Sequence, residues 1–189
     1  MSTMRTVALT KESTKDILEN LLKRSPNNYG KFESAVDEIL HKVKTEGDSA
    51  LFAYTKEFDK TEITADTIKV TEEEIKEAYE AVDPALIDVI RKALVNIRSY
   101  HEKQRQNSWF TSETNGTMLG QKVTALQRVG VYVPGGKAVY PSSVLMNIVP
   151  AKVAGVDQIV MTTPPGKDGK VNPSTLVAAK EAGADEIYK

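Results

Sequence analysis

The spacing of apolar residues changes along the chain and divides it into three segments. Residues 1–30 are mostly polar, with one short amphipathic stretch from Asp16 to Leu22. In residues 31–128 apolar side chains mostly recur every three or four positions, the repeat of helices with one buried face. Residues 129–189 alternate short apolar runs with helical stretches, which predicts parallel strands joined by helices. We therefore expect an N-terminal arm, a helical lobe and a partial α/β domain.

The helical segment carries start and stop signals at the expected spacing. Gly47 ends the first predicted helix, because glycine readily adopts the left-handed conformation that terminates helices. Thr71 followed by Glu74 is a capping box, and Asp83-Pro84 starts the longest helix. The first helix is expected to bury the stripe Val36, Ile39, Leu40 and Val43. The longest is expected to bury Leu86, Val89, Ile90, Ala93, Leu94, Ile97 and Tyr100.

Three further elements of this segment are not predicted to be long helices with a buried stripe. Residues 51–58 predict a short second helix, and the β-branched run Thr67–Val70 predicts an extended link. From Trp109 to Gln127 apolar and polar residues alternate around Asn115-Gly116, a dipeptide suited to a tight hairpin turn. A β-hairpin is therefore expected there.

The last segment predicts three strands, at residues 129–133, 158–162 and 186–189. The helix after the first strand is expected to be capped by Ser142 or Ser143 and to end at Gly155. The helix after the second is expected to begin at Asn172-Pro173 and to end at Gly183. Strands separated in this way predict an incomplete Rossmann-like parallel sheet. Because the chain stops within the third strand, we expect that strand to leave an unpaired edge, as in a truncated domain.

Composition narrows the class of protein. The chain has 25 Lys and Arg against 26 Asp and Glu and a net charge of −1, which argues against a nucleic-acid partner. It has no cysteine, so disulfides and thiolate metal sites are excluded. No apolar run approaches the roughly 20 residues that span a bilayer, and the first residues lack the apolar core of a signal peptide. We expect a cytoplasmic protein without a membrane partner.

The turn after the first parallel strand is the strongest candidate for chemistry. Residues 130–137 read Gly-Val-Tyr-Val-Pro-Gly-Gly-Lys. A glycine-rich turn between a strand and a helix lets backbone N–H groups approach a phosphate, aided by the partial positive charge of the helix start. The segment matches neither the Walker A pattern nor G-x-G-x-x-G. The residues alone therefore leave two readings open, a nucleotide contact and a structural turn.

No catalytic arrangement is evident elsewhere. His41 and His101 are sixty residues apart, and neither has a second histidine at metal-ligand spacing. Solvated or packing roles account for both. Ser142 and Ser143 are candidates for ligand contact as well as for helix capping, while Lys137 and Tyr140 belong to the same loop. We assign no catalytic residue to this chain.

Residues 127–156 nevertheless resemble the hallmark segment of the histidinol dehydrogenase family. The matching runs are Gln127–Ala138, Tyr140–Asn147 and Pro150–Val156, followed by Thr163-Pro164-Pro165 and Ala182–Tyr188. Upstream, the layout and the segment Phe52–Asp59 agree more loosely. The chain is thus similar to the N-terminal portion of that family.

The resemblance implies an α/β enzyme with an N-terminal helical lobe, a hairpin and incomplete Rossmann-like domains of aldehyde-dehydrogenase-like architecture. It implies a homodimer that oxidises L-histidinol to L-histidine with NAD and zinc. By the resemblance, Tyr132 contacts NAD beside Gly135 and Gly136, and Ser142 lies in the substrate-side loop. The zinc ligands and the proton-transferring glutamate and histidine are expected beyond residue 189, so the chain alone is expected to be inactive.

Two other interpretations remain open. One is a non-catalytic nucleotide-binding or interaction module that is complete at this length. The other is a different Rossmann-like dehydrogenase, against which the absence of G-x-G-x-x-G counts. Tyr132 buried inside a closed core would contradict the NAD assignment.

Overall fold

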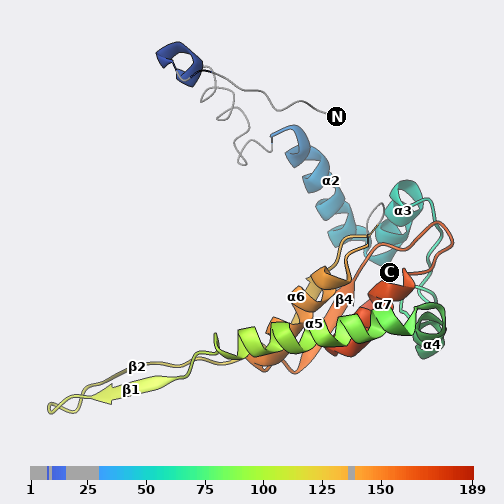
Figure 1. The fold of residues 1–189 in the computed structure, drawn as a ribbon. Coiled ribbons are helices and arrows are strands. Elements are labelled where there is room, and N and C mark those ends of the chain that lie inside the picture. Colours follow the sequence, from blue (N-terminus) through green and yellow to red (C-terminus); the bar gives the residue numbers. More distant parts are fainter. Residues whose placement is uncertain (1–7, 9, 16–29, 136–138) are drawn as a thin grey trace. The chain divides into compact units, whose positions relative to one another are not determined.

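The computed structural model describes residues 8, 10–15, 30–135 and 139–189 (Figure 1). The chain forms two compact units, Met1–Ala50 and Leu51–Lys189. The predicted amphipathic stretch from Asp16 to Leu22 lies outside the described residues. In the described part no helix is long and apolar enough to cross a membrane.

Helix α2 (Gly30–Glu46) is the main described element of the first unit, and α3 (Asp48–Phe58) begins there. Gly47 separates the two helices as predicted, with a φ of 63°. The predicted buried stripe of α2 is wrong at Val36 and Leu40, whose side chains are exposed. An amphipathic repeat predicts that a helix has an apolar face, but it does not specify what covers that face.

The second unit contains the predicted parallel sheet. Strands β3 (Arg128–Tyr132), β4 (Gln158–Thr162) and β5 (Glu186–Tyr188) lie in the order β3-β4-β5, and both pairings are parallel. Helix α6 (Pro141–Ala154) connects β3 to β4, and α7 (Pro173–Ala182) connects β4 to β5. The register places Val131 beside Met161 and Met161 beside Ile187. The predicted strand–helix alternation is confirmed.

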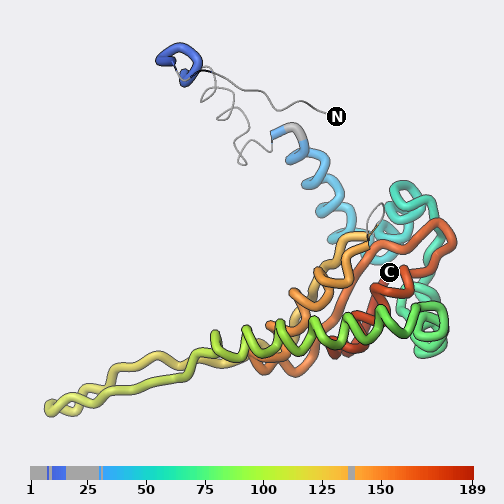
Figure 2. Tube along the Cα trace, in the orientation of Figure 1, coloured from blue at the N-terminus to red at the C-terminus, as the bar shows by residue number. Residues whose placement is uncertain are grey.

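The core lies between one face of this sheet and its helices. Ile159, Met161 and Ile187 are buried because alternate strand residues point to the same face. Helix α5 (Pro84–Glu102) packs on α6 and α7, and α4 (Glu72–Ala81) packs on α7. Figure 2 shows the course of α5 across these helices. The helices predicted as a separate lobe thus share one core with the parallel sheet.

The shared core can be compared with the predicted division into three domains. The division into residues 1–30, 31–128 and 129–189 stays a prediction. Residues 51–189, however, share one hydrophobic core that is not divided at residue 128. Buried residues of α4 and α5 belong to the same cluster as those of α6, α7 and the sheet.

Most predicted helix ends are confirmed. Thr71 and Glu74 form both hydrogen bonds of a capping box. Asp83 accepts a hydrogen bond from the Ala85 N–H, and Asn172 accepts one from the Ser174 N–H. Gly155 and Gly183 end α6 and α7 in the left-handed conformation.

The predicted serine cap of α6 is wrong. Tyr140 is the N-cap and makes no side-chain capping bond, and Pro141 occupies the first turn. Proline suits that position because its φ is already helical and it lacks the N–H that would otherwise need a partner. Ser142 and Ser143 are therefore the second and third residues of the helix, within its first turn, and not its cap.

The buried face of α5 is also rotated from the predicted one. Ile87 and Ile90 are buried, with Leu94 and Ile97 partly buried on the same side. Leu86, Val89 and Tyr100, which were expected in the stripe, are exposed. Apolar residues occupy more than one face of this helix, so the repeat alone did not identify the packed one.

The outer edge of β5 is closed, contrary to expectation. The extended link Ile68–Val70 runs alongside it: the Val70 N–H donates to Ile187 O at 2.9 Å, and the Lys189 N–H donates to Ile68 O at 2.8 Å. Lys69 and Tyr188 form the antiparallel bridge between them. A segment 117 residues earlier in the sequence supplies this pairing, which local pattern could not reveal.

The predicted hairpin is present. Strands β1 (Trp109–Ser112) and β2 (Met118–Gln121) pair antiparallel, with Ser112 opposite Met118. Gly116 in the turn has a φ of 84°, but Asn115 does not have a positive φ, so the connection is a three-residue loop whose glycine is left-handed and not the tight two-residue turn that Asn-Gly favours. Every residue of both strands is exposed.

One carboxylate joins three helices of the core. The Glu181 carboxylate in α7 accepts hydrogen bonds from the Tyr79 hydroxyl in α4 at 2.9 Å and from Arg91 Nε and Nη2 in α5 at 3.0 and 2.8 Å. Burial, followed by the bond to Glu181, raises the pKa of Tyr79 to about 12. The forked guanidinium contact fixes the helices in orientation as well as in distance.

A second carboxylate fixes the start of β4. Asp185 Oδ2 accepts the Ile159 N–H at 2.7 Å and lies 3.1 Å from Lys152 Nζ of α6. The bond from the Ile159 N–H, followed by that from Lys152, holds the pKa of Asp185 below its ordinary value despite partial desolvation.

We predict that Asp185→Asn destabilises the chain at pH 7. The loss should be about 1 kcal/mol, below the roughly 1.5–3 kcal/mol of a hydrogen bond to a charged group, because the side chain is 39% exposed and its charge is screened by solvent. The folded-state pKa is lowered, so this stabilisation is present above the ordinary carboxyl pKa and is lost as the pH falls through the folded value. Urea unfolding at pH 7 and at pH 3 measures it.

Asp157→Asn is the matched control. It removes the same charge from an exposed side chain next to β4, so it should leave stability within about 0.5 kcal/mol of the parent at both pH values. Equal losses in the two variants would show that net charge, rather than the bond to Ile159, is responsible.

Candidate functional site

A cavity opens where the carboxyl ends of β3 and β4 meet. Its volume is about 310 Å³. The loop after β3 contributes Pro134, Gly135 and Val139, and the loop after β4 contributes residues 163–166. At the start of α7, Asn172, Pro173 and Thr175 form part of the remaining wall. Ligands of open α/β sheets bind at this end of the strands, so the cavity is the best-placed candidate site.

Gly135 keeps the two loops in close contact. A Cβ atom added there would lie 3.0 Å from Pro164 O and 3.3 Å from Pro164 Cδ. Glycine is therefore needed for the close approach of the backbones. Gly136, predicted beside it, lies outside the described residues.

Tyr132 is the last residue of β3 and is 60% exposed. Its neighbour Val133 points the other way and is buried, with its N–H donating to Thr162 O at 2.9 Å. This alternation directs the Tyr132 side chain to the sheet face opposite the core. Tyr132 does not line the 310 Å³ cavity, but its ring is accessible beside the loop that does.

Ser142 lies in the first turn of α6 and is exposed. It follows Pro141, and the next N–H, that of Ser143, donates to Tyr140 O at 2.9 Å. Ser142 is not among the residues of the cavity. Of the predicted site residues, the structure thus places Gly135 in the cavity wall and leaves Tyr132 and Ser142 accessible on adjoining elements.

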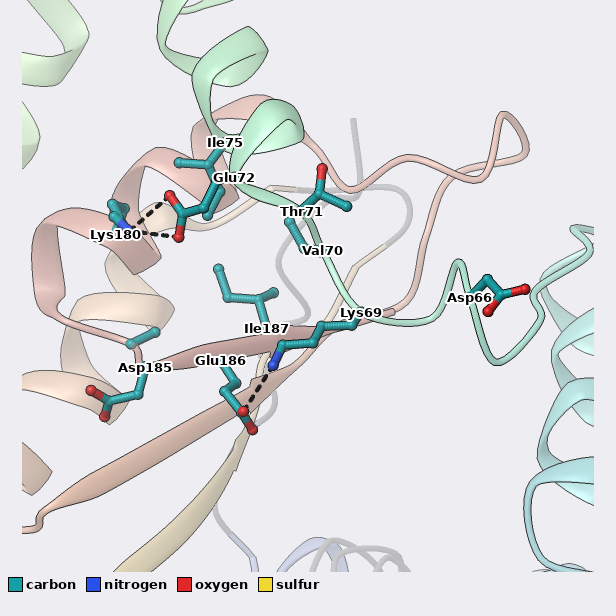
Figure 3. A pocket seen from close by; sticks show the side chains of 11 residues that line it. Asp66, Lys69, Val70, Thr71, Glu72, Ile75, Lys180, Asp185, Glu186 and Ile187 are labelled. Atoms are coloured by element: carbon teal, nitrogen blue, oxygen red, sulfur yellow. Dashed lines mark hydrogen bonds and ion pairs between the residues drawn. The ribbon is translucent and has the colours of Figure 1, made fainter.

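A larger and more charged pocket of about 500 Å³ lies at β5 (Figure 3). Its charges neutralise each other: Lys180 Nζ contacts Glu72 at 3.0 Å, and Lys69 Nζ contacts Glu186 at 2.8 Å. These pairs join α7 to α4 and β5 to the extended link. Because most of the charges that line it are paired across elements, we interpret this pocket as a structural junction. The sequence could not indicate it, since each partner lies more than 100 residues from the other.

Neither histidine is among the residues that line the cavity at β3 and β4. His41 lies on α2 and is exposed. His101 Nδ1 lies 2.7 Å from Gln104 Oε1, and its Nε2 is buried without a partner among the described residues. No cluster of three or more histidine, aspartate or glutamate side chains in the described ranges could hold a metal ion.

Comparison with known proteins gives a consistent family match. The family model described as histidinol dehydrogenase matches residues 22–189. A histidinol dehydrogenase of Bacillus subtilis is 58% identical over 154 residues, covering 82% of this chain and 36% of that protein. One of Heliobacterium mobile is 53% identical over 171 residues, covering 90% of this chain and 40% of that protein.

Structural comparison agrees. The crystal structure of histidinol dehydrogenase from Elizabethkingia anophelis matches with a TM-score of 0.77 and 36% identity, covering 84% of this chain and 36% of that one. The mixed α/β fold is therefore shared with that protein. The chain spans well under half the length of these relatives.

We predict that Gly135→Ala destabilises the chain by about 1 kcal/mol. The added methyl group must push Pro164 away, at a cost of roughly 1–3 kcal/mol. That exceeds the 0.4–1 kcal/mol or so gained by restricting the unfolded chain. Thermal unfolding measures the difference.

Gly130→Ala is the control, because a Cβ there has nothing within 4 Å. It should be neutral or slightly stabilising. If both alanine variants were equally stable, the close contact between the loops after β3 and β4 would not constrain residue 135.

Proposed function

Because this chain belongs to the histidinol dehydrogenase family, we propose that it forms part of an enzyme that oxidises L-histidinol to L-histidine with NAD and zinc. The family match over residues 22–189 carries the proposal. The cavity at the carboxyl ends of β3 and β4 supports it, because a nicotinamide cofactor bound to a parallel sheet would lie at that end.

In this proposal the parallel sheet is one half of a Rossmann-like domain within an aldehyde-dehydrogenase-like architecture. The order β3-β4-β5, with α6 and α7 as crossovers, is that of one βαβαβ half of such a domain. The half-sheet supplies one wall of a dinucleotide crevice.

NAD, which accepts hydride when bound, would contact Tyr132, Gly135 and Gly136. The exposed ring of Tyr132 offers a flat apolar surface at the end of β3. Gly135 lets the loop backbone pack closely beside it, and the start of α6 adds partial positive charge for a phosphate. Ser142, in the first turn of α6, would face the substrate side of the same loop.

The described residues do not fit the zinc ion. The chain has no cysteine, and the described ranges contain no cluster of potential ligands. We place the zinc ligands and the glutamate and histidine that transfer protons in the part of the family polypeptide outside these 189 residues. This chain's role is then to orient cofactor and substrate. The homodimeric assembly and the cytoplasmic location also remain proposals.

We predict that the purified chain does not oxidise L-histidinol. It should bind NAD more weakly than about 1 mM, equivalent to less than roughly 4 kcal/mol, because only one wall of the crevice is present. Calorimetry and NADH absorbance measure the two properties. Micromolar NAD binding by a monomer would instead favour a non-catalytic nucleotide-binding module, and turnover would contradict the assignment of the catalytic groups.

A chimaera should reveal the role of Tyr132. In it, this chain replaces the matching segment of the Bacillus subtilis relative, which is 58% identical. We predict NAD-dependent oxidation of L-histidinol, and a roughly tenfold rise in the KM for NAD in Tyr132→Ala, or about 1.4 kcal/mol. The KM for L-histidinol should change little. Steady-state kinetics with each substrate varied separates the two effects.

Tyr100→Ala is the control, because Tyr100 is equally exposed, at 62%, but lies on α5. It should leave both KM values unchanged. If Tyr132→Ala behaved like Tyr100→Ala in an active chimaera, Tyr132 would not contact NAD.

A further inference from the structure

The hairpin loop contains the one Asn-Gly dipeptide of the sequence, Asn115-Gly116. The loop is closed by two backbone bonds: the Glu113 N–H donates to Thr117 O at 2.8 Å, and the Gly116 N–H donates to Glu113 O at 3.0 Å. Asn115 and Gly116 are both exposed, and a Cβ atom added to Gly116 would meet nothing within 4 Å. Water and base therefore have free access to both residues.

The Asn115 side chain is bonded to the backbone of this loop. Its Oδ1 accepts the Thr117 N–H at 2.9 Å. This bond draws electron density away from the side-chain carbonyl group, which makes Cγ a better target for a nucleophile. It also turns the carboxamide toward the backbone that follows Asn115, where the next nitrogen is that of Gly116. Glycine has no Cβ atom that could shield this nitrogen.

The other asparagines in the described ranges lack this combination of features. Asn96 and Asn147 lie within α5 and α6, where the helical backbone holds the following nitrogen away from the side chain and an isoleucine follows each. Asn172 precedes a proline, whose nitrogen carries no hydrogen. Asn107 is exposed outside helices and strands, but the side chain of Ser108 shields the next nitrogen. Asn107 is therefore the internal comparison for Asn115.

We propose that Asn115 is a modification site at which the chain loses ammonia and forms isoaspartate, with aspartate as a second product. A solvent base first removes the Gly116 N–H proton, and the nitrogen then attacks Asn115 Cγ. The N–Cγ bond forms, the Cγ–Nδ2 bond breaks, and the leaving nitrogen takes a proton from solvent to become ammonia. The product is a five-membered cyclic imide.

Water then opens this imide at either of its two carbonyl carbons. Cleavage of the bond between nitrogen and Cγ gives aspartate. Cleavage of the bond between nitrogen and the main-chain carbonyl carbon gives isoaspartate, in which the backbone runs through Cβ and Cγ. One water enters and one ammonia leaves in total, and nothing is oxidised or reduced.

Isoaspartate at position 115 would open the hairpin. The altered linkage adds a backbone carbon to a loop whose length sets the strand register, and it removes the amide oxygen that accepts the Thr117 N–H. It also places a carboxylate near Glu113 in a chain whose net charge is already −1. Every residue of β1 and β2 is exposed, so little burial opposes separation of the two strands. The pairing of Ser112 with Met118 should therefore be lost.

The test is incubation of the purified 189-residue chain at pH 7 and at pH 8 in water enriched in heavy oxygen. Trypsin cleaves after Arg105 and Lys122, so one peptide carries both Asn107 and Asn115. Mass spectrometry should show loss of ammonia at Asn115 at least roughly tenfold faster than at Asn107, with one heavy oxygen incorporated. The rate should rise about tenfold from pH 7 to pH 8, because the attacking nitrogen must first lose its proton. Methylation of the peptide by an isoaspartyl methyltransferase identifies the isoaspartate.

Two matched variants separate the sites. Asn115→Gln should slow the reaction at position 115 at least roughly tenfold, because the ring would need six members instead of five, whereas Asn107→Gln should leave it unchanged. In the parent chain, NMR contacts between Ser112 and Met118 should disappear in proportion to the isoaspartate formed. The Val133 amide, which is bonded to Thr162 O in the parallel sheet, should stay protected.

If Asn115→Gln disturbs the loop, the comparison of Asn107 with Asn115 in the parent chain decides alone. Equal rates at these two residues, or a reaction at Asn115 only after unfolding in guanidinium, would overturn the proposal. Isoaspartate at position 115 with the contacts between β1 and β2 retained would overturn the opening of the hairpin. These readouts involve neither NAD nor L-histidinol, so they are independent of the proposed function.

Discussion

Backbone hydrogen bonding of the parallel sheet is the constraint on which the rest of the second unit depends. The N–H and carbonyl groups of every strand residue need hydrogen-bonding partners. The pairing of β3 with β4 and of β4 with β5 provides them for β4 and for the sides of β3 and β5 that face β4. The link Ile68–Val70 satisfies the outer side of β5. The outer side of β3 is left without a described partner, and the candidate site lies at the carboxyl end of this same strand.

The core follows from that sheet. Alternation along β4 and β5 buries Ile159, Met161 and Ile187 on one face, against the helices that connect the strands. Glu181 then ties α7 to α4 and α5, so the helices upstream of the sheet become part of its covering layer. This arrangement fixes the loops after β3 and β4, and with them Gly135 against Pro164.

Much of the local structure could be predicted because its causes are local. The capping box at Thr71, the proline starts of α5 and α7, the hairpin turn at Gly116 and the glycine ends of α6 and α7 each depend on a few neighbouring residues. The family could be predicted from the loop after β3 for the same reason, since its residues are contiguous. The exposed position of Tyr132 agrees with the NAD assignment, but the roles of Tyr132, Gly135, Gly136 and Ser142 stay predictions.

What could not be predicted depends on distant partners. Helices α6 and α7 pack on α5 and determine which of its sides is buried, so Ile87 is buried and Leu86 is exposed. The outer edge of β5 is paired with a segment that lies more than 100 residues earlier in the sequence. Local pattern therefore predicted an unpaired edge where the structure has a paired one. The start of α6 was misplaced because two serines suggested a cap where Pro141 had already begun the helix.

A crystal structure of the chimaeric enzyme with NAD bound would test most directly whether β3 is one wall of a shared crevice. We expect the cofactor beside Tyr132 and Gly135. A cofactor bound elsewhere would contradict this interpretation.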